Sequence, residues 1–213
     1  GTYWSTMTHI CQISGAVRSD GTLWTWGNNT PGGLGHNNKT SCSSPKQVPG
    51  TWSTTAGSII VNSTSDSAFT AVKPDGTLWC WGAGNDGQLG QGNQTWYSSP
   101  VQVGTDTTWS ATDGHIGSTG RMSPVCIKTD GTMWAWGRNS HGELGQNNRT
   151  EYESPVQIPG SDYTYVSKGK NNHDQKGSTF FIKSDSTLWG IGSLWYGTAG
   201  NNYGSASMSS ASN

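Results

Sequence analysis

The stretch 130–137, Asp-Gly-Thr-Met-Trp-Ala-Trp-Gly, carries the strongest structural signal in the sequence. An Asp-Gly pair between alternating apolar residues is typical of the tight turn of a β-hairpin, because both central positions of a type I′ turn need a positive φ. The segment therefore predicts two antiparallel strands that are joined at Asp130-Gly131.

The same pattern recurs with a period of 55 residues, so that its turns lie at 20–21, 75–76, 130–131 and 185–186. The Trp-Gly, Leu-Gly and Ser-Pro pairs that follow keep the same spacing. The fourth copy degenerates, with Ser186 for Gly, Ile191 for Trp and Ser210 for Pro. A fixed period of this length indicates a repeat architecture. We expect one repeat domain over 1–213, with a polar terminal segment at 204–213.

A two-residue turn at each Asp-Gly pair also predicts which residues face each other across the hairpin. Val17 then faces Trp24, and the opposite face pairs small residues, as in Ala16 with Thr25. A lone hairpin cannot bury two apolar faces, so neighbouring repeats must stack on it. Radial stacking of such sheets is a β-propeller, and a linear solenoid is the competing geometry. We predict an all-β fold of about four blades, with its tryptophans largely buried.

The composition agrees with a folded, turn-rich β protein. Gly, Ser, Thr and Asn supply 101 of the 213 residues, and charged residues only 12%. Such a polar composition is typical of disordered chains, but these chains are poor in aromatic residues, whereas this sequence has twelve tryptophans. The net charge of −1 gives no global field for nucleic acid or an anionic membrane. No apolar run is long enough to cross a bilayer, so we expect a soluble protein that has no membrane insertion and does not bind nucleic acid.

The string from Ser123 to Pro155 resembles the repeat of the regulator-of-chromosome-condensation family, through its D-G, W-G, N-x-x-G-x-L-G and P-x-x-V spacing. The resemblance covers about four repeats and implies a β-propeller with four-stranded blades. Propellers of this family have about seven blades, within the range known for the fold. The chain is then an arc of a larger propeller, a ring completed by oligomerisation or by a longer chain, or a four-bladed ring that closes alone. The regular first copy leads us to expect association through the N-terminal face.

The residue types that usually carry chemistry show no pattern that supports it. The four cysteines have no C-x-x-C spacing; Cys80 and Cys126 are expected on faces that do not meet, and pairing of Cys11 with Cys42 is left open. The five histidines, at 9, 36, 115, 141 and 173, are scattered. The G-x-G-x-x-G string at 82–87 is not repeated in the equivalent loops, which argues against a nucleotide site. We predict no catalytic, cofactor-binding or metal residues, and therefore no enzyme.

Two sets of polar residues recur in register with the repeat. A basic residue precedes each turn aspartate by two positions, and we expect its stem to cover a cross-strand Leu or Met rather than to join an anion-binding ring; these residues are Arg18, Lys73, Lys128 and Lys183. Three N-x-[ST] sites at Asn38, Asn93 and Asn148 are glycosylation candidates, or alternatively loop residues with a left-handed backbone.

These observations favour a non-enzymatic structural or protein-binding propeller. The polar surface fits an exposed assembly component such as a virion, tail-fibre or extracellular filament subunit, whose partner is another subunit or a second copy. The resemblance implies two alternatives: a secreted inhibitor that grips a partner protein by one propeller rim, and a guanine-nucleotide-exchange-like chromatin protein. Loop aromatics that would suit a partner interface are Trp96, Tyr97, Trp195 and Tyr196.

Overall fold

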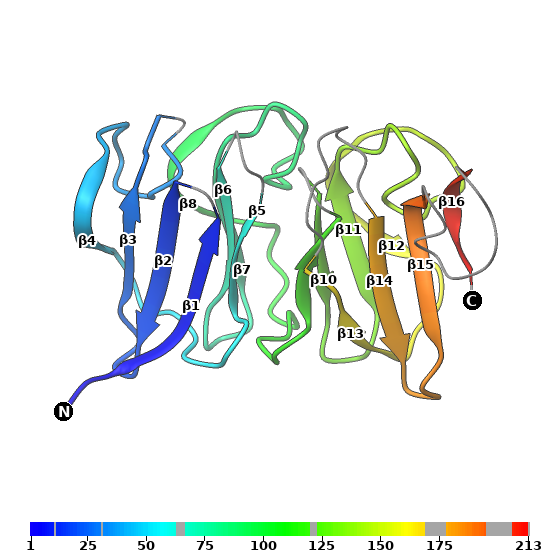
Figure 1. Cartoon of the computed structure of the whole chain (residues 1–213), viewed down its shortest axis with the longest axis horizontal. Helices are drawn as coiled ribbons and strands as arrows, with labels where there is room; N and C mark the ends of the chain where they lie inside the picture. The colour runs from blue at the N-terminus through cyan, green and yellow to red at the C-terminus, as the bar shows by residue number, and fades with distance from the viewer. Residues whose placement is uncertain are drawn as a thin grey trace.

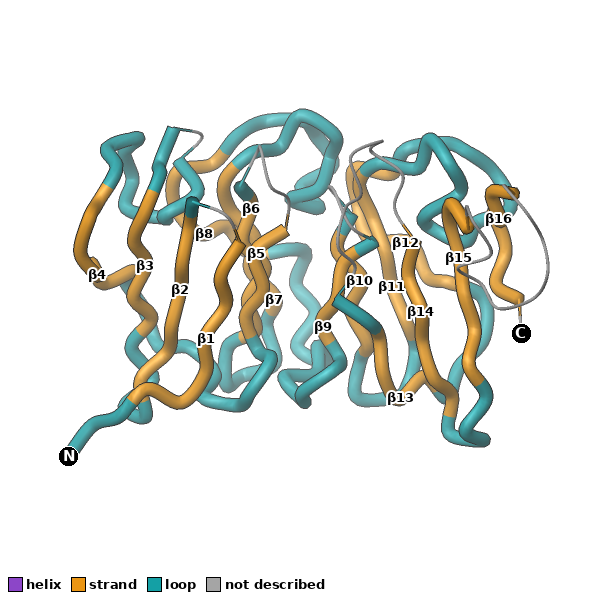
Figure 2. The backbone as a smooth tube through the Cα atoms, viewed as in Figure 1, coloured by secondary structure: helices purple, strands orange, loops and turns teal. Residues whose placement is uncertain are grey.

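The computed structural model describes residues 1–10, 12–30, 32–62, 67–119, 123–168, 178–194 and 206–212. In these residues sixteen strands form four antiparallel sheets of four strands each, without a helix. The sheets stand side by side in chain order, with β1 to β4 at one end and β13 to β16 at the other (Figures 1 and 2). This arrangement confirms the all-β fold, and each sheet is one propeller blade.

Each blade is built from four strands that are consecutive in the chain and in the sheet. Blade 1 contains β1 (Trp4–Ile10), β2 (Ile13–Arg18), β3 (Leu23–Gly27) and β4 (Cys42–Val48). Blade 2 contains β5 (Ile59–Asn62), β6 (Ala68–Val72), β7 (Leu78–Gly82) and β8 (Tyr97–Gln102). Blade 3 contains β9 (Ile116–Ser118), β10 (Pro124–Ile127), β11 (Met133–Gly137) and β12 (Tyr152–Ile158). Blade 4 contains β13 (Tyr163–Val166), β14 (Ser178–Lys183), β15 (Leu188–Leu194) and β16 (Ala206–Ser212).

The hairpin turns are longer than predicted by one residue. In blade 1 the N–H of Gly21 donates to the carbonyl of Arg18, and the N–H of Arg18 donates to the carbonyl of Thr22. Gly21 has a φ of 80°, so this loop is a type I turn followed by a left-handed residue. The Asp20 carboxylate accepts hydrogen bonds from the N–H and the hydroxyl of Thr22, which holds the aspartate inside the turn. All four turns share this geometry.

The longer turn displaces the cross-strand register by one residue. Val17 faces Leu23 rather than Trp24, and Ala16 faces Trp24 rather than Thr25. The predicted pairing of small residues is therefore wrong, and so is the pairing of β-branched residues with Trp. In every copy the tryptophan after the turn faces a residue that had been assigned to the small-residue face; these residues are Ala16, Ala71, Cys126 and Phe181.

Each sheet has two apolar faces of different character. We call the face with Trp24, Trp26 or their equivalents the Trp face, and the face with Leu23 or its equivalents the Leu face. The Leu face of one blade packs on the Trp face of the next, and Val17 and Leu23 thus share a core with Trp81. The same packing joins blades 2 and 3 and blades 3 and 4. The hydrophobic core therefore lies in three layers between the blades.

The shifted register also corrects the expectation for two cysteines. Cys80 lies on the Leu face of blade 2 and Cys126 on the Trp face of blade 3, so both belong to the core between these blades. Both thiols are free and buried, and burial raises the pKa of Cys80 to about 12. The prediction that they lie on faces that do not meet is wrong because it depended on the two-residue turn.

Hydrogen bonds tie each blade to the blade before it. The peptide N–H of Trp52, at the entry to blade 2, donates to the carbonyl of the turn residue Gly21 at 2.8 Å. Trp109 and Tyr163 make the same bond to Gly76 and Gly131. The indole N–H groups of Trp81 and Trp136 donate to the carbonyls of Gly33 and Gln88, both at 2.9 Å. Each blade thus supplies both a packing surface and acceptors to its successor.

A buried asparagine closes the loop after the third strand in blades 1 and 3. The side-chain amide of Asn139 donates to the carbonyls of Asn148 and Thr150, and its Oδ1 accepts from the N–H of Leu144. Asn29 makes the equivalent bonds in blade 1. Blade 2 has Gly84 at this position, where a Cβ would collide with the carbonyl of Thr95. This substitution produces the G-x-G-x-x-G string, which is thus a variant of a structural loop.

Candidate functional site: the turn face

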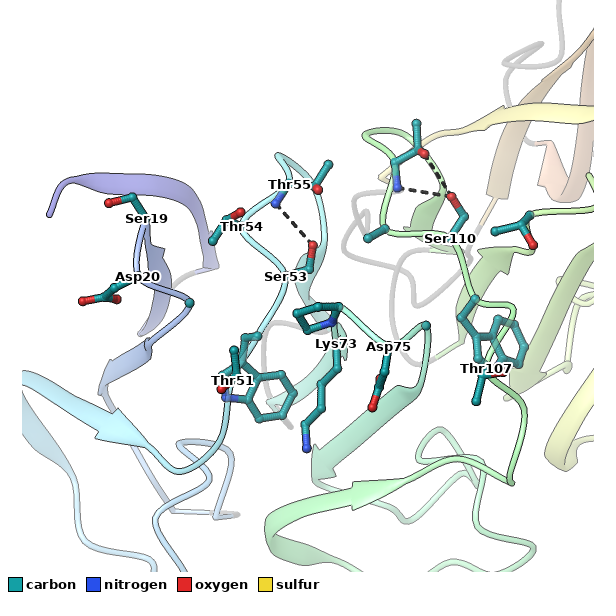
Figure 3. A pocket seen from close by; sticks show the side chains of 18 residues that line it. Ser19, Asp20, Thr51, Ser53, Thr54, Thr55, Lys73, Asp75, Thr107 and Ser110 are labelled. Atoms are coloured by element: carbon teal, nitrogen blue, oxygen red, sulfur yellow. Dashed lines mark hydrogen bonds between the residues drawn. The ribbon is translucent and has the colours of Figure 1, made fainter.

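A groove of about 800 Å³ crosses the rim of the arc on which the Asp-containing turns lie, which we call the turn face. It is lined by the turns of blades 1 and 2, by Thr129 of blade 3, and by the segments that enter blades 2 and 3, within 51–55 and 107–112 (Figure 3). The buried rings of Trp52 and Trp109 belong to its lining. The groove therefore spans three blades.

Local hydrogen bonds set the shape of the two entering segments. The N–H of Thr55 donates to the hydroxyl of Ser53, and the N–H of Thr112 donates to the hydroxyl of Ser110 (Figure 3). His115 lies behind Ser110, with its Nδ1 2.8 Å from the Ser110 hydroxyl and its Nε2 3.1 Å from the Thr164 carbonyl of blade 4. The histidine thus connects the wall of the groove to the next blade, and burial lowers its pKa.

The exposed charges of the groove are mainly carboxylates. Hydrogen bonds from the side chain and then the backbone of Thr22 lower the pKa of Asp20, and those from Thr77 do the same for Asp75. Asp130 and Asp185 repeat this arrangement farther along the rim. At neutral pH the turn face therefore presents a row of ionised carboxylates.

The basic residues of the turns lie on aromatic rings instead of on the cross-strand Leu or Met that we had expected. The Nζ of Lys73 lies 3.7 Å from the ring centroid of Trp79, and that of Lys128 lies 4.1 Å from Trp134. The shifted register explains the correction, because it places the tryptophans on the same face as these lysines. Lys128 also pairs with Asp106, which lowers the pKa of this carboxyl to about 2.

Of the partner-binding residues predicted from the sequence, the two that the structure describes, Trp96 and Tyr97, are not part of the lining of this groove. Trp96 is 43% exposed in the loop before β8, near the Lys39 ammonium of blade 1. Tyr97 is half-buried at the start of β8. Trp195 and Tyr196 lie outside the described residues. Residue type thus pointed to the loop that carries Trp96. Most residues of the groove are short polar ones, and the sequence analysis did not single them out as a site.

The three glycosylation candidates have a structural part in their loops. The Oδ1 of Asn38 accepts from the N–H of Thr40, and its amide donates to the carbonyl of His36. Asn93 and Asn148 make the same two bonds. The left-handed backbone lies one residue earlier, at Asn37, Gly92 and Asn147. Glycosylation of these asparagines stays a prediction.

The remaining cysteines and histidines form no shared site in the described residues. Cys42 is a free thiol 3.9 Å from the Nδ1 of His36, whereas Cys11 and His173 lie outside the described residues. His141 pairs with the buried Glu143. No group of three or more His, Cys, Asp or Glu in the described ranges could hold a metal ion. Within these ranges no helix is long and apolar enough to cross a membrane.

Comparison with known proteins identifies the repeat. The family model described as "Regulator of chromosome condensation (RCC1) repeat" matches residues 20–59, 75–119 and 130–172, more than half of the chain. The human E3 ubiquitin-protein ligase HERC2 is 28% identical over 144 residues, which are 67% of this chain and 3% of that protein.

The architecture is similar to that of solved RCC1 propellers. Human WBSCR16 superimposes with a TM-score of 0.74 at 16% identity, over 99% of this chain and 52% of its own. Prp20p of Saccharomyces cerevisiae gives 0.69 at 19% identity, over 91% of this chain and 45% of its own. The chain spans about half the length of these solved relatives. With three repeats matched by the family model and four blades of the expected architecture, the chain belongs to the regulator of chromosome condensation (RCC1) repeat family.

Proposed function

We propose that this chain is a non-catalytic protein-binding module whose groove on the turn face holds a basic, donor-rich segment of a partner protein. The observation that carries the proposal is the groove itself, a preformed concave surface across three blades. The polar side chains that line it are mostly Ser and Thr hydroxyl groups, with the carboxylates of Asp20 and Asp75 and the ammonium group of Lys73, which lies on the ring of Trp79. Because ionised carboxylates only accept hydrogen bonds, they favour lysine, arginine and backbone N–H groups as partners.

The relatives support a protein as the partner. The structural work on Prp20p also describes its binding properties to Gsp1p and histones, both of which are proteins. The proposal needs no virion or extracellular setting, and the relatives give no support to that expectation from composition. A secreted-inhibitor role and the exclusion of nucleic acid likewise remain predictions that rest on the sequence.

The test uses a synthetic peptide of alternating lysine and alanine, with a glutamate-for-lysine peptide as the charge control. Titration calorimetry should detect binding of the lysine peptide that weakens with added salt. The double variant Asp20→Asn/Asp75→Asn should weaken binding by about tenfold, which corresponds to the loss of two charge-assisted contacts.

Asp185→Asn is the matched control, because Asp185 lies in the equivalent turn of blade 4 but does not line the groove. An equal loss of affinity in the control and in the double variant would show that the effect comes from general surface charge, and would contradict binding in the groove. Absence of binding to the lysine peptide would contradict the proposal as a whole.

Nucleotide exchange on a small GTPase is the second candidate, favoured by the similarity to Prp20p, for which binding to Gsp1p is described. We expect no exchange activity, since these 213 residues have a net charge of −1 and contain no strongly basic stretch. Stopped-flow measurement of nucleotide release tests this expectation. Strong acceleration by this chain would replace the binding-only role with exchange.

A further inference from the structure

A second pocket, of about 360 Å³, lies at the junction of blades 1 and 2. Residues from β4 and β8, which are edge strands of the two sheets, line it together with part of the loop before β4. The rings of Trp52 and Trp79 also belong to its lining, and it shares Trp52 and Lys73 with the groove on the turn face. Its volume lies within the range of sites for small ligands.

The charged side chains of this pocket are cationic. Lys46 and Lys73 line it, and none of the described residues in its lining is an Asp or a Glu. The Nζ of Lys73 lies 3.7 Å from the ring centroid of Trp79 and 5.2 Å from that of Trp52. Within the described part of the chain this ammonium group makes no hydrogen bond and no ion pair. A half-buried cation without a counter-charge favours an anionic ligand.

The next junction shows which anionic group fits a lysine in this setting. Between blades 2 and 3, the Nζ of Lys128 lies 4.1 Å from the ring centroid of Trp134 and 4.8 Å from that of Trp109. Lys128 donates a hydrogen bond to the carboxylate of Asp106, and the two form an ion pair. A lysine that lies on two tryptophan rings thus holds a carboxylate at this junction.

The segment that enters blade 2 is too short to supply the same group. Residues 49–51 lie between the last core valine of blade 1 and Trp52, whereas residues 104–108 lie between the equivalent valine of blade 2 and Trp109. The longer segment carries Asp106, and the shorter one consists of Pro, Gly and Thr. The junction of blades 1 and 2 therefore keeps the lysine and both tryptophans of this arrangement but has no carboxylate of its own.

There is space beside the Lys73 ammonium group, and a second donor borders it. A Cβ placed on Gly50 would lie 3.7 Å from both the Nζ of Lys73 and the Nε1 of Trp52, with no atom closer. The Trp52 indole N–H is buried and has no acceptor among the described residues. The indole N–H of Trp109 also has no acceptor although Asp106 lies nearby, so we assign the main contact to the lysine.

We propose that the pocket between blades 1 and 2 binds a ligand that joins a carboxylate to an apolar or aromatic group. The carboxylate pairs with Lys73, Lys46 adds a second positive charge, and the apolar group lies against the half-buried ring of Trp79. A free organic acid and a glutamate side chain of a partner share this chemistry. The site is separate from the proposed function, because the Lys73 side chain extends away from Ser53 and Thr55 of the groove (Figure 3).

Titration with benzoate, followed by nuclear magnetic resonance of the indole N–H groups, tests the proposal. Benzoate at millimolar concentrations should shift the signals of Trp52 and Trp79, and the neutral isostere benzamide should bind at least tenfold more weakly. Lys73→Met keeps the apolar stem and should weaken benzoate binding by about tenfold or more, because it removes a charge-assisted contact. Lys183→Met is the matched control, since Lys183 lies on Trp189 in the equivalent turn of blade 4 and does not line the pocket.

A near-isosteric pair of variants tests the charge of the pocket without removing a contact of the fold. Gln47→Glu places a carboxylate in the lining and should also weaken benzoate binding, whereas Gln157→Glu at the equivalent position of blade 3 should not. A Phe-Glu peptide with blocked ends, titrated in parallel, distinguishes a protein side chain from a free acid as the source of the carboxylate.

Circular dichroism checks that each variant is folded. Binding of either probe that is lost in Lys73→Met and kept in Lys183→Met supports the site, and the tighter probe identifies the source. Failure of both probes to bind, equal binding of benzoate and benzamide, or equal losses in Lys73→Met and Lys183→Met would each overturn the proposal.

Discussion

The internal junctions and the open ends of this arc use the same sequence positions with different outcomes. Leu78 and Leu188 occupy one repeat position, yet the first is fully buried and the second mostly exposed. Trp81 and Trp26 differ in the same direction, since Trp81 is buried and Trp26 is only half-buried. The comparison teaches that a repeat residue stabilises the fold through its neighbouring blade, and that a terminal blade lacks half of this contribution.

The largest expected effect comes from the tryptophans of the core. Trp81→Ala should lower the free energy of unfolding by about 3 to 5 kcal/mol, because it removes a fully buried aromatic side chain and its hydrogen bond to Gly33. Trp26→Ala should cost only about 1 to 2 kcal/mol, since its ring is already partly in water. Urea denaturation followed by circular dichroism compares the two. Equal losses would show that the end blade is packed as tightly as an internal one.

The buried loop asparagines should not depend on the position of the blade. Asn139→Ala and Asn29→Ala should each cost about 2 kcal/mol, because each leaves buried backbone groups of its own blade without partners. Thermal and urea denaturation measure both variants. The exposed Arg149 in the same loop is the control, and its replacement by Ala should have little effect. A clear difference between Asn29 and Asn139 would mean that neighbouring blades also support these loops.

The fourth turn offers a stabilising change. Ser186 has a φ of 68°, in the left-handed region that costs a residue with a Cβ about 1 to 2 kcal/mol. Ser186→Gly should therefore raise the free energy of unfolding by about 0.5 to 1 kcal/mol, after the greater chain entropy of glycine is counted.

The reverse change at an internal turn is the matched comparison. Gly76→Ser should destabilise the protein, because its φ is 78° and a Cβ there would collide with the carbonyl of Thr107. The unfolding temperatures of the two variants should move in opposite directions. A lower value for Ser186→Gly would indicate that the serine makes a compensating contact in blade 4.

The smallest effect is a pH dependence at the junction of blades 3 and 4. Burial lowers the pKa of His115 from 6.5, so the folded protein binds a proton less readily than the unfolded chain. Stability should therefore be complete above that pH and should fall as the pH drops through and below it. Urea midpoints at about pH 8 and about pH 5 should differ less in His115→Gln than in the wild type. An unchanged difference would assign the effect to other groups, such as His36, whose pKa burial also lowers.

The sequence pattern was sufficient to predict the blades, but not to predict which residues face each other across the strands of each hairpin. Three Asp-Gly pairs and the 55-residue period, which adds Asp185-Ser186, placed all four turns and predicted small stacked sheets. The predicted cross-strand register was wrong because an Asp-Gly pair fits two kinds of hairpin loop. It can form a whole two-residue turn or the last two residues of a three-residue loop, and the two loops give registers that differ by one residue. In the structure the hydroxyl of Thr22 donates a hydrogen bond to the Asp20 carboxylate within the longer loop.

The groove on the turn face was not predicted, because its short polar side chains belong to segments that are far apart in the chain. Ser19, Ser53 and Ser110 carry no motif, and only the stacking of three blades brings their segments to one surface. The exposed loop residue Trp96 was a stronger candidate for partner binding than these serines, because aromatic residue types are common at interfaces. Residue type marks chemical capacity, whereas a concave surface depends on how separate segments meet.

The sequence by itself determined the repeat, the strands and the family, because a hydrophobic alternation that is bounded by turn residues every 55 positions has few other solutions. Only the tertiary structure decided which face of each blade meets its neighbour, where Lys73 places its charge, and which equivalent residues stay in water. These properties arise from contacts between blades. A sequence that repeats one unit carries the same local instructions for the buried Leu78 and the exposed Leu188, so only the presence or absence of a neighbouring blade distinguishes them.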